Sequence, residues 1–169
     1  MESLTELLQD QLKDLYNAEK QLTKALPKMK KAATTEQLQE AIEGHRVQTE
    51  EHVNRLEQVF ELLGKKPQAK KCDAMEGLLK EGDSVVEETE EGSMTRDAGI
   101  IISAQKVEHY EIAAYGGMAQ LATTMGLDEV AELLRQTLEE EKETDASLTE
   151  IAENDINWQA EQEADEAEK

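Results

Sequence analysis

The chain has 169 residues, a length that suits one domain, with only two prolines, one Trp, three Tyr and one Phe. Leu, Ala, Glu, Gln and Lys dominate, which is typical of long helices, and no alternating run of β-branched and aromatic residues indicates a strand. The formal net charge of -21 at pH 7 argues against binding to nucleic acids or anionic membranes. It predicts a solvated acidic surface, and the alternative is a surface that attracts metal ions or basic partners. These totals predict a single all-α domain.

The first two predicted helices run from about residue 3 to 31 and from about 35 to 63. In the first, leucines recur at alternating steps of three and four residues, and Ser3 stands three residues before a glutamate, as in a capping box. The second ends at Gly64, which two lysines and a proline follow. The turn between them is short, so the two helices are expected to be antiparallel neighbours.

The stretch from residue 65 to 95 has a different character. A basic loop, "KKPQAKKCD", precedes "AMEGLLKEGDSVVEETEEG", which has the pattern of a short amphipathic helix. We interpret the stretch as a crossover connection rather than a domain. It leads to a third helix at about 95–125 and a fourth at about 128–157, which "GLD" separates.

Two helical hairpins joined by one long crossover form a ferritin-like four-helix bundle, which we assign to residues 1–158. The alternative is an ordinary up-down bundle with a large loop. Residues 159–169 are polar and mostly acidic and are expected to form a flexible tail.

Several features favour the cytoplasm. The single cysteine, Cys72, cannot form an internal disulfide, which favours a reducing compartment. The first residues, "MESLTELLQD", lack the basic and apolar regions of a signal peptide, and no apolar run is long enough to cross a membrane. We therefore expect a cytoplasmic protein that does not enter membranes.

Polar residues interrupt the apolar stripe near the middle of each long helix. The interruptions are Glu19 in the first helix, His45, Thr49 and His52 in the second, Glu108 and Glu111 in the third, and Glu141 and Asp145 in the fourth. A helix rises about 1.5 Å per residue, which places Glu19 level with His52 in one hairpin and Glu108 level with Glu141 in the other. We therefore expect these side chains in one layer of the bundle.

Buried carboxylates in such a layer would each cost several kcal/mol, and their charges would repel one another. A pair of divalent or trivalent cations removes both problems, and carboxylates with an imidazole suit iron or manganese. The predicted ligands of this dinuclear site are Glu19, His52, Glu108, Glu111, Glu141 and Asp145. In the alternative interpretation, some of these glutamates lie at the edge of the stripe and reach water.

Neighbouring polar residues receive other interpretations. His45 lies two turns from His52, about 10 Å away, too far to share one ion, and is expected to be a hydrogen-bonded core residue. His109 is expected to face away from the site. Tyr16 either donates a hydrogen bond behind the first-helix glutamate or simply packs, and Asp145 is either a ligand or a surface acid.

Four segments carry a family resemblance: "DLYNAEKQL", "KKCDAMEGLLKE", "QKVEHYEIAAYG" and "TLEEEKETD". Over about residues 3–155 the chain resembles the bacterial ferritin-like stress proteins of the YciF and YciE type. The resemblance implies a rubrerythrin-like dinuclear metal site and often a dimer, but no established reaction. It equates Glu19, Glu108, Glu111 and Glu141 with glutamates that the broad class carries on its first, third and fourth helices.

The chain departs from that class at two threonines. The class usually carries Glu-x-x-His on its second and fourth helices, whereas Thr49 precedes His52 here and Thr144 follows Glu141. The site therefore has fewer histidines than the class implies. A rubredoxin-like set of cysteines is also lacking, so a redox reaction would need an external electron donor.

Two functions of different kinds remain. One is a redox metalloprotein that reduces peroxide or oxidises iron(II). The other is a structural or interaction protein whose metal stabilises the bundle. The third helix is apolar on more than one face at "GIIISA" and "IAAYGGMAQLA", which favours a homodimer. Iron storage ranks third, because nothing indicates assembly beyond a dimer.

Overall fold

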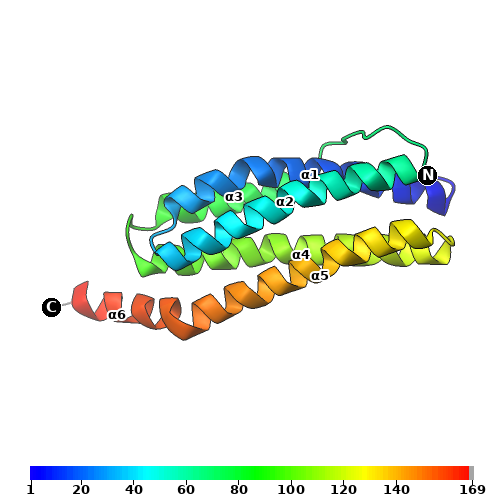
Figure 1. Cartoon of the computed structure of the whole chain (residues 1–169). Coiled ribbons are helices and arrows are strands. Elements are labelled where there is room, and N and C mark those ends of the chain that lie inside the picture. The colour runs from blue at the N-terminus through cyan, green and yellow to red at the C-terminus, as the bar shows by residue number, and fades with distance from the viewer. Residues whose placement is uncertain (168–169) are drawn as a thin grey trace.

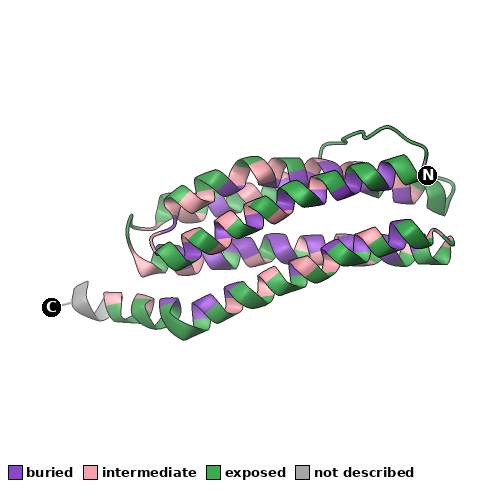
Figure 2. Cartoon of the chain, in the orientation of Figure 1, coloured by how far each residue is buried: buried purple, intermediate pink, exposed green. Residues whose placement is uncertain are grey.

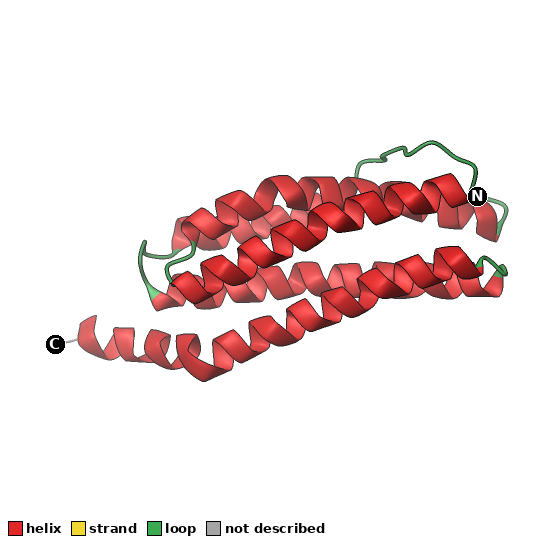
Figure 3. Cartoon of the chain, viewed as in Figure 1, coloured by secondary structure: helices red, strands yellow, loops and turns green. Residues whose placement is uncertain are grey.

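The computed structural model describes residues 1–167, which form long α-helices joined by loops, the longest of them between Leu62 and Asp73 (Figures 1 and 3). Two antiparallel hairpins build the bundle, and a shorter helix lies in the connection between them. The helices are α1 (Leu4–Ala32), α2 (Glu36–Leu62), α3 (Asp73–Glu88), α4 (Met94–Thr124), α5 (Asp128–Ile151) and α6 (Asn157–Ala167). The predicted all-α bundle with a long crossover that contains a short helix is confirmed.

Short polar side chains fix where the helices begin. The hydroxyl of Ser3 accepts a hydrogen bond from the backbone N–H of Glu6 at 3.2 Å, as the capping spacing predicts. Thr35 and Ser93 cap α2 and α4 in the same way. Such caps satisfy N–H groups that have no partner inside the helix.

Asp97 ties the two hairpins together. This buried carboxylate near the start of α4 accepts the backbone N–H groups of Thr34 and Thr35, at 2.6 and 2.8 Å, and the hydroxyl of Thr35 at 2.7 Å. These three bonds fasten the turn between α1 and α2 to the beginning of α4. They therefore set the height of one hairpin against the other.

The core lies along the inward faces of the four long helices (Figure 2). On α1 the predicted stripe is buried from Leu8 through Leu12 and Leu15 to Leu22 and Leu26. None of the described helices combines the length and apolar character that crossing a membrane requires.

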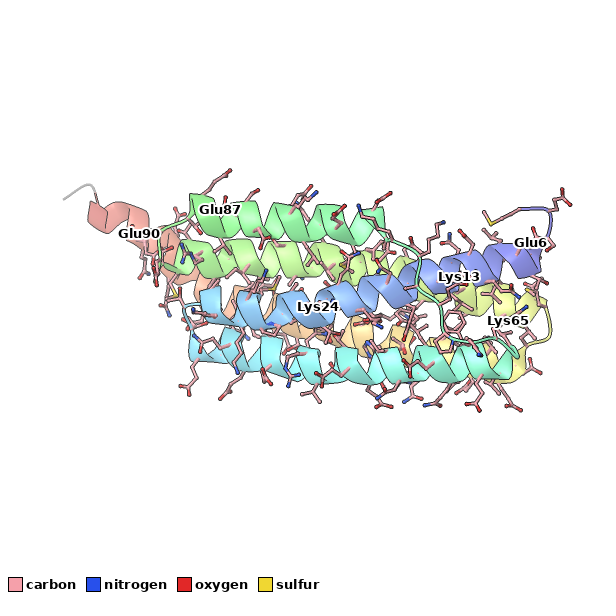
Figure 4. The ribbon with its side chains drawn as sticks, turned by 90° about the horizontal axis from the view of Figure 1, so that it is seen from above. Glu6, Lys13, Lys24, Lys65, Glu87 and Glu90 are labelled. Carbon is pink, nitrogen blue, oxygen red and sulfur yellow. The ribbon has the colours of Figure 1, made fainter. Side chains whose placement is uncertain are left out.

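The crossover helix α3 packs against α4 and α1 (Figure 4, in which Glu87 marks the end of α3). Arg96 at the start of α4 binds the end of α3, since its guanidinium donates to the carbonyl of Val86 at 3.0 Å and to the hydroxyl of Thr89 at 3.2 Å. The helices approach closely at Gly99, where an added Cβ would lie 2.5 Å from Cγ1 of Val85.

The C-terminal end differs from the expected elements. The fourth helix, predicted to about residue 157, ends as α5 at Ile151, and a π-helical turn leads into α6. The predicted flexible tail, 159–169, is helical as far as Ala167, and residues 168–169 lie outside the described part. The carboxylate of Glu163 accepts the backbone N–H groups of Met94 and Thr95 at 2.6 and 3.1 Å. A carboxylate at the positive end of α4 is favourable, which explains why the segment docks.

The contact between α3 and α4 predicts that Gly99→Ala destabilises the protein. The valine side chain is stiff in a helix and cannot swing away, so the two helices must separate locally. We expect the free energy of unfolding in urea to fall by about 1–2 kcal/mol, although alanine is the better helix former.

Two controls identify the cause. The double variant Val85→Ala/Gly99→Ala should recover most of the loss, because the clashing methyl group is gone. Gly77→Ala on α3 meets nothing within 4 Å and should stabilise the protein by about 0.5–1 kcal/mol. If Gly99→Ala is as stable as Gly77→Ala, this packing is wrong.

Candidate metal centre

Six polar side chains from four helices meet in the interior of the bundle. They are Glu19 of α1, His45 and His52 of α2, Glu108 and Glu111 of α4, and Glu141 of α5, and none is more than 6% exposed. Five of the six predicted ligands are therefore brought together.

The six side chains form two groups that share one carboxylate. His45, Glu108, Glu111 and Glu141 form the His45 group, and Glu19, His52 and Glu141 form the His52 group. Within each group, one nitrogen or oxygen atom per residue lies within 4.8 Å of all the others. Glu141 belongs to both groups, which is the arrangement that a carboxylate bridge between two ions requires.

Many polar atoms of this cluster have no hydrogen-bond partner. Among the described residues, the buried side-chain nitrogen and oxygen atoms without a hydrogen-bond partner all belong to these six side chains. His52 Nδ1 lies 3.0 Å from Glu141 Oε1 and His45 Nε2 lies 3.2 Å from Glu108 Oε1, but neither pair has the direction of a hydrogen bond. Each unsatisfied buried polar group costs about 1–3 kcal/mol, and bound cations would remove that cost.

Burial shifts the protonation of the carboxylates. It raises the pKa of Glu19 from 4.5 to about 7, because the nearby His52 offsets only part of the effect. Burial also raises the pKa values of Glu108 and Glu111 well above their usual range, and the charge of Glu141 adds to the effect. Without cations, several of these groups hold protons near neutral pH, and cations would displace them.

An ion pair behind His52 orients its ring. Nε2 of His52 lies 2.9 Å from a carboxylate oxygen of Glu140, which Arg55 holds through two bonds of 2.9 and 3.1 Å. The ring therefore donates Nε2–H outward and turns Nδ1 toward Glu19 and Glu141. Burial lowers the pKa of His52, but the surrounding carboxylates outweigh it and raise the value to about 9.

A tyrosine donates a hydrogen bond to Glu19, but it is Tyr115 rather than Tyr16, which the sequence suggested. The hydroxyl of Tyr115, which is fully buried, donates to Glu19 Oε1, and its ring lies edge-on to His52 at 6.3 Å. Tyr16 instead donates to Glu57 at 2.7 Å and packs against Phe60.

His45 was expected to be a hydrogen-bonded core residue, but neither ring nitrogen has a hydrogen-bond partner. The structure contains two groups instead of one, and each histidine belongs to a different group. The signal in the sequence was the spacing of seven residues, which places both histidines on one face of α2.

Asp145, the sixth predicted ligand, lies outside both groups. Its carboxylate accepts a hydrogen bond from Gln105 Nε2 at 3.2 Å and lies 3.3 Å from Nε2 of the exposed His109. His109 therefore faces away from the centre, as expected.

The two threonines that replace motif residues add no ligand. Thr49 donates to the carbonyl of His45 at 2.9 Å, and Thr144 donates to the carbonyl of Glu140 at 3.1 Å. The Thr49 hydroxyl is thus used within its own helix, and the Thr144 hydroxyl also lies 3.4 Å from Oε1 of Gln48 on α2.

Fold and site together define an all-α four-helix bundle with a buried carboxylate–histidine cluster at its centre. The model of the family described as "Domain of unknown function (DUF892)" matches residues 3–161, and the chain belongs to this family. The predicted kinship with YciF-type proteins is confirmed, because the chain is 46% identical to the protein YciF of Escherichia coli K12 over 97% of its length and 99% of the relative.

Solved structures show the same fold. The crystal structure of the E. coli stress protein YciF matches with a TM-score of 0.88 and 45% identity, covering 93% of this chain and 99% of that one. YcfI of Rhodopseudomonas palustris, provisionally described as a structural protein, matches with a TM-score of 0.84 and 40% identity, covering 88% and 94%. A protein of Xanthomonas campestris pv. campestris matches at 0.74 with 26% identity, covering 96% and 99%.

The raised pKa values predict how the metal-free protein responds to pH. Glu19, Glu108 and Glu111 keep protons in the folded state that the unfolded chain releases above about pH 4.5. Their stabilisation is therefore complete below that pH and is lost as the pH rises through the folded-state pKa, about 7 for Glu19. His52 acts in the same direction up to about pH 9, whereas His45, whose pKa burial lowers, opposes them.

We therefore expect the melting temperature of the chelated protein to fall between about pH 5 and pH 8, with on the order of 3 kcal/mol lost from Glu19 alone. The protein saturated with manganese(II) should show the opposite trend, since the ion competes with protons. Thermal melts of both forms across this range are the measurement. Identical pH profiles for the two forms would contradict the assignment.

The ion pair behind His52 predicts a specific loss of metal affinity. Glu140→Gln removes the charge that orients the ring, so affinity at the His52 group should fall about 10- to 100-fold in chelator competition. The matched control is Glu139→Gln, because that exposed neighbour pairs with Lys142, at 2.7 Å, and belongs to neither group. Equal affinities in the two variants would show that the pair does not position His52.

Proposed function

We propose that this protein binds two iron or manganese ions, one in the His45 group and one in the His52 group, and that the pair reacts with peroxide or oxidises iron(II). The observation that carries the proposal is that the unpartnered buried polar atoms among the described residues all lie in these two groups.

The donor set fits such a pair. Four glutamates and two histidines offer carboxylate oxygens and imidazole nitrogens, which suit iron and manganese. The four carboxylates, once ionised, carry a charge that two divalent cations neutralise. When bound, the ions would polarise a peroxide and supply two electrons for its reduction.

The protein's own residues would prepare the centre for that chemistry. Glu141 would bridge the ions, the Glu140–Arg55 pair holds the His52 tautomer, and the Tyr115 hydroxyl steadies Glu19. Buried leucines one turn on either side of Glu19 would shield its carboxylate from water. Turnover would need an external electron donor, since the chain has a single cysteine.

The second candidate is a structural or interaction protein whose metal only stabilises the bundle. The description of the relative YcfI favours it. The two functions differ in one respect: chelation lowers the melting temperature in both, whereas only the redox protein consumes peroxide faster than free metal does.

The cellular role, the compartment and the oligomeric state of the protein are also proposals. A stress-associated role is supported by the description of the E. coli relative as a stress protein, and a cytoplasmic setting by the single, buried cysteine. A homodimer is supported by the apolar segment "GIIISA" of α4, in which Ile102 remains 57% exposed.

Metal content tests the proposal residue by residue. The wild type should hold two ions per chain. His45→Gln and His52→Gln should each hold about one, and Glu141→Gln, which weakens both groups, should hold fewer than one. Elemental analysis of protein loaded with iron(II) without oxygen gives the counts.

Asp145→Asn is the matched control, because it removes an acid from the same helix but from neither group. It should keep two ions. A wild type without bound metal, or equal losses in Asp145→Asn and Glu141→Gln, would contradict the proposal. Two ions with no peroxide consumption above that of free iron would instead favour the structural candidate.

A further inference from the structure

A pocket of about 370 Å³ reaches the His45 group from the surface. Its walls are mainly apolar and include Leu22, Leu26, Ile42 and Leu148 from three helices. The volume lies within the range of about 300–1,000 Å³ that is usual for small-molecule sites.

The exposure of the lining residues shows which end of the pocket opens to solvent. The exposed lining residues Gly44 of α2 and Glu143 and Ser147 of α5 form its mouth, which therefore opens between these helices. The buried lining residues His45 and Glu108 form its inner end.

The two metal-binding groups differ in access. In the His52 group, the ring is held from behind by Glu140. In the His45 group, neither ring nitrogen nor Oε2 of Glu108 has a hydrogen-bond partner, and both residues line the pocket. A ligand that enters the pocket therefore meets unsatisfied polar atoms at its end.

The apolar walls and the negative charge of the pocket indicate which chemical class of ligand it can bind. Apolar walls favour an aliphatic tail, since burial of hydrocarbon is favourable. The net charge of -21, with Glu108 and Glu143 lining the pocket, disfavours an anionic head. A neutral O–H group can donate to Glu108 and accept from the ring N–H of His45, and the same oxygen can approach an ion held by this group.

We propose that the pocket binds a neutral aliphatic molecule with a hydroxyl or hydroperoxyl head, which is placed at His45 and Glu108. The proposal rests on the proposed metal centre for the role of the head group. Burial of the tail depends on the apolar walls alone.

Chain length provides the test. The metal-loaded protein is titrated with 1-butanol, 1-pentanol and 1-hexanol by calorimetry. Affinity should rise about threefold to fourfold with each added methylene, because each one buries further hydrocarbon. Hexyl hydroperoxide and 1-hexanol, both titrated into protein loaded with zinc(II), which is not redox-active, separate the two head groups. Tighter binding of the hydroperoxide identifies it as the natural class, and equal or weaker binding identifies the alcohol.

Three variants locate the binding. Gly44→Leu and Ser147→Leu place a large side chain at the mouth from opposite walls, and each should weaken 1-hexanol binding at least tenfold. Gly77→Leu is the matched control, because that glycine also lies in a helix with open space around it but does not line the pocket. It should bind like the wild type.

Metal content, measured on the same samples, keeps the two proposals distinct. Two bound ions without chain-length dependence, or normal binding by both mouth variants, would overturn this inference alone. Chain-length dependence without bound metal would overturn the proposed function alone. If no alcohol binds and Gly44→Leu turns a dimer into a monomer, a second copy covers the pocket and the inference is wrong.

Discussion

The interior of this bundle depends on the cost of enclosing acid in a hydrophobic core. Glu19, Glu108, Glu111 and Glu141 lie where leucine would stabilise the protein more, and their oxygens find few hydrogen bonds. A fold keeps such a cluster only if protons or cations neutralise it. Stability and metal binding are therefore linked, because the ionised carboxylates that bind cations best are also the form that destabilises the metal-free protein most.

The rest of the structure arranges the cluster. Asp97 sets the height of the hairpins, so carboxylates from different helices meet in one layer. Glu140 and Arg55 act on one side of that layer and leave the other side free. The resulting asymmetry, with His52 held and His45 open to a pocket, would give the two ions different tasks. An ion behind a fixed histidine is suited to a structural role, whereas one beside a pocket is suited to exchange ligands.

Much of this arrangement could be predicted from hydrophobic periodicity. Helical spacing places Glu19, Glu108 and Glu141 on inward faces, and the single long connection predicts the crossover. Residues at the margin of a stripe were harder to place, because a shift of one position moves a side chain by about 100° around the helix. In the acidic run on α5 that ambiguity left Asp145 as either a ligand or a surface acid, and it hid the role of Glu140.

Contacts between segments that are distant in the sequence could not be predicted from hydrophobic periodicity. Tyr115 meets Glu19, and Glu163 meets the start of α4, only because the bundle has closed. The most direct test is anomalous diffraction from crystals of the protein loaded with manganese(II). The account predicts two peaks about 3.5–4 Å apart with the carboxylate of Glu141 between them. The absence of peaks in this layer, with the carboxyl groups paired to one another instead, would contradict it.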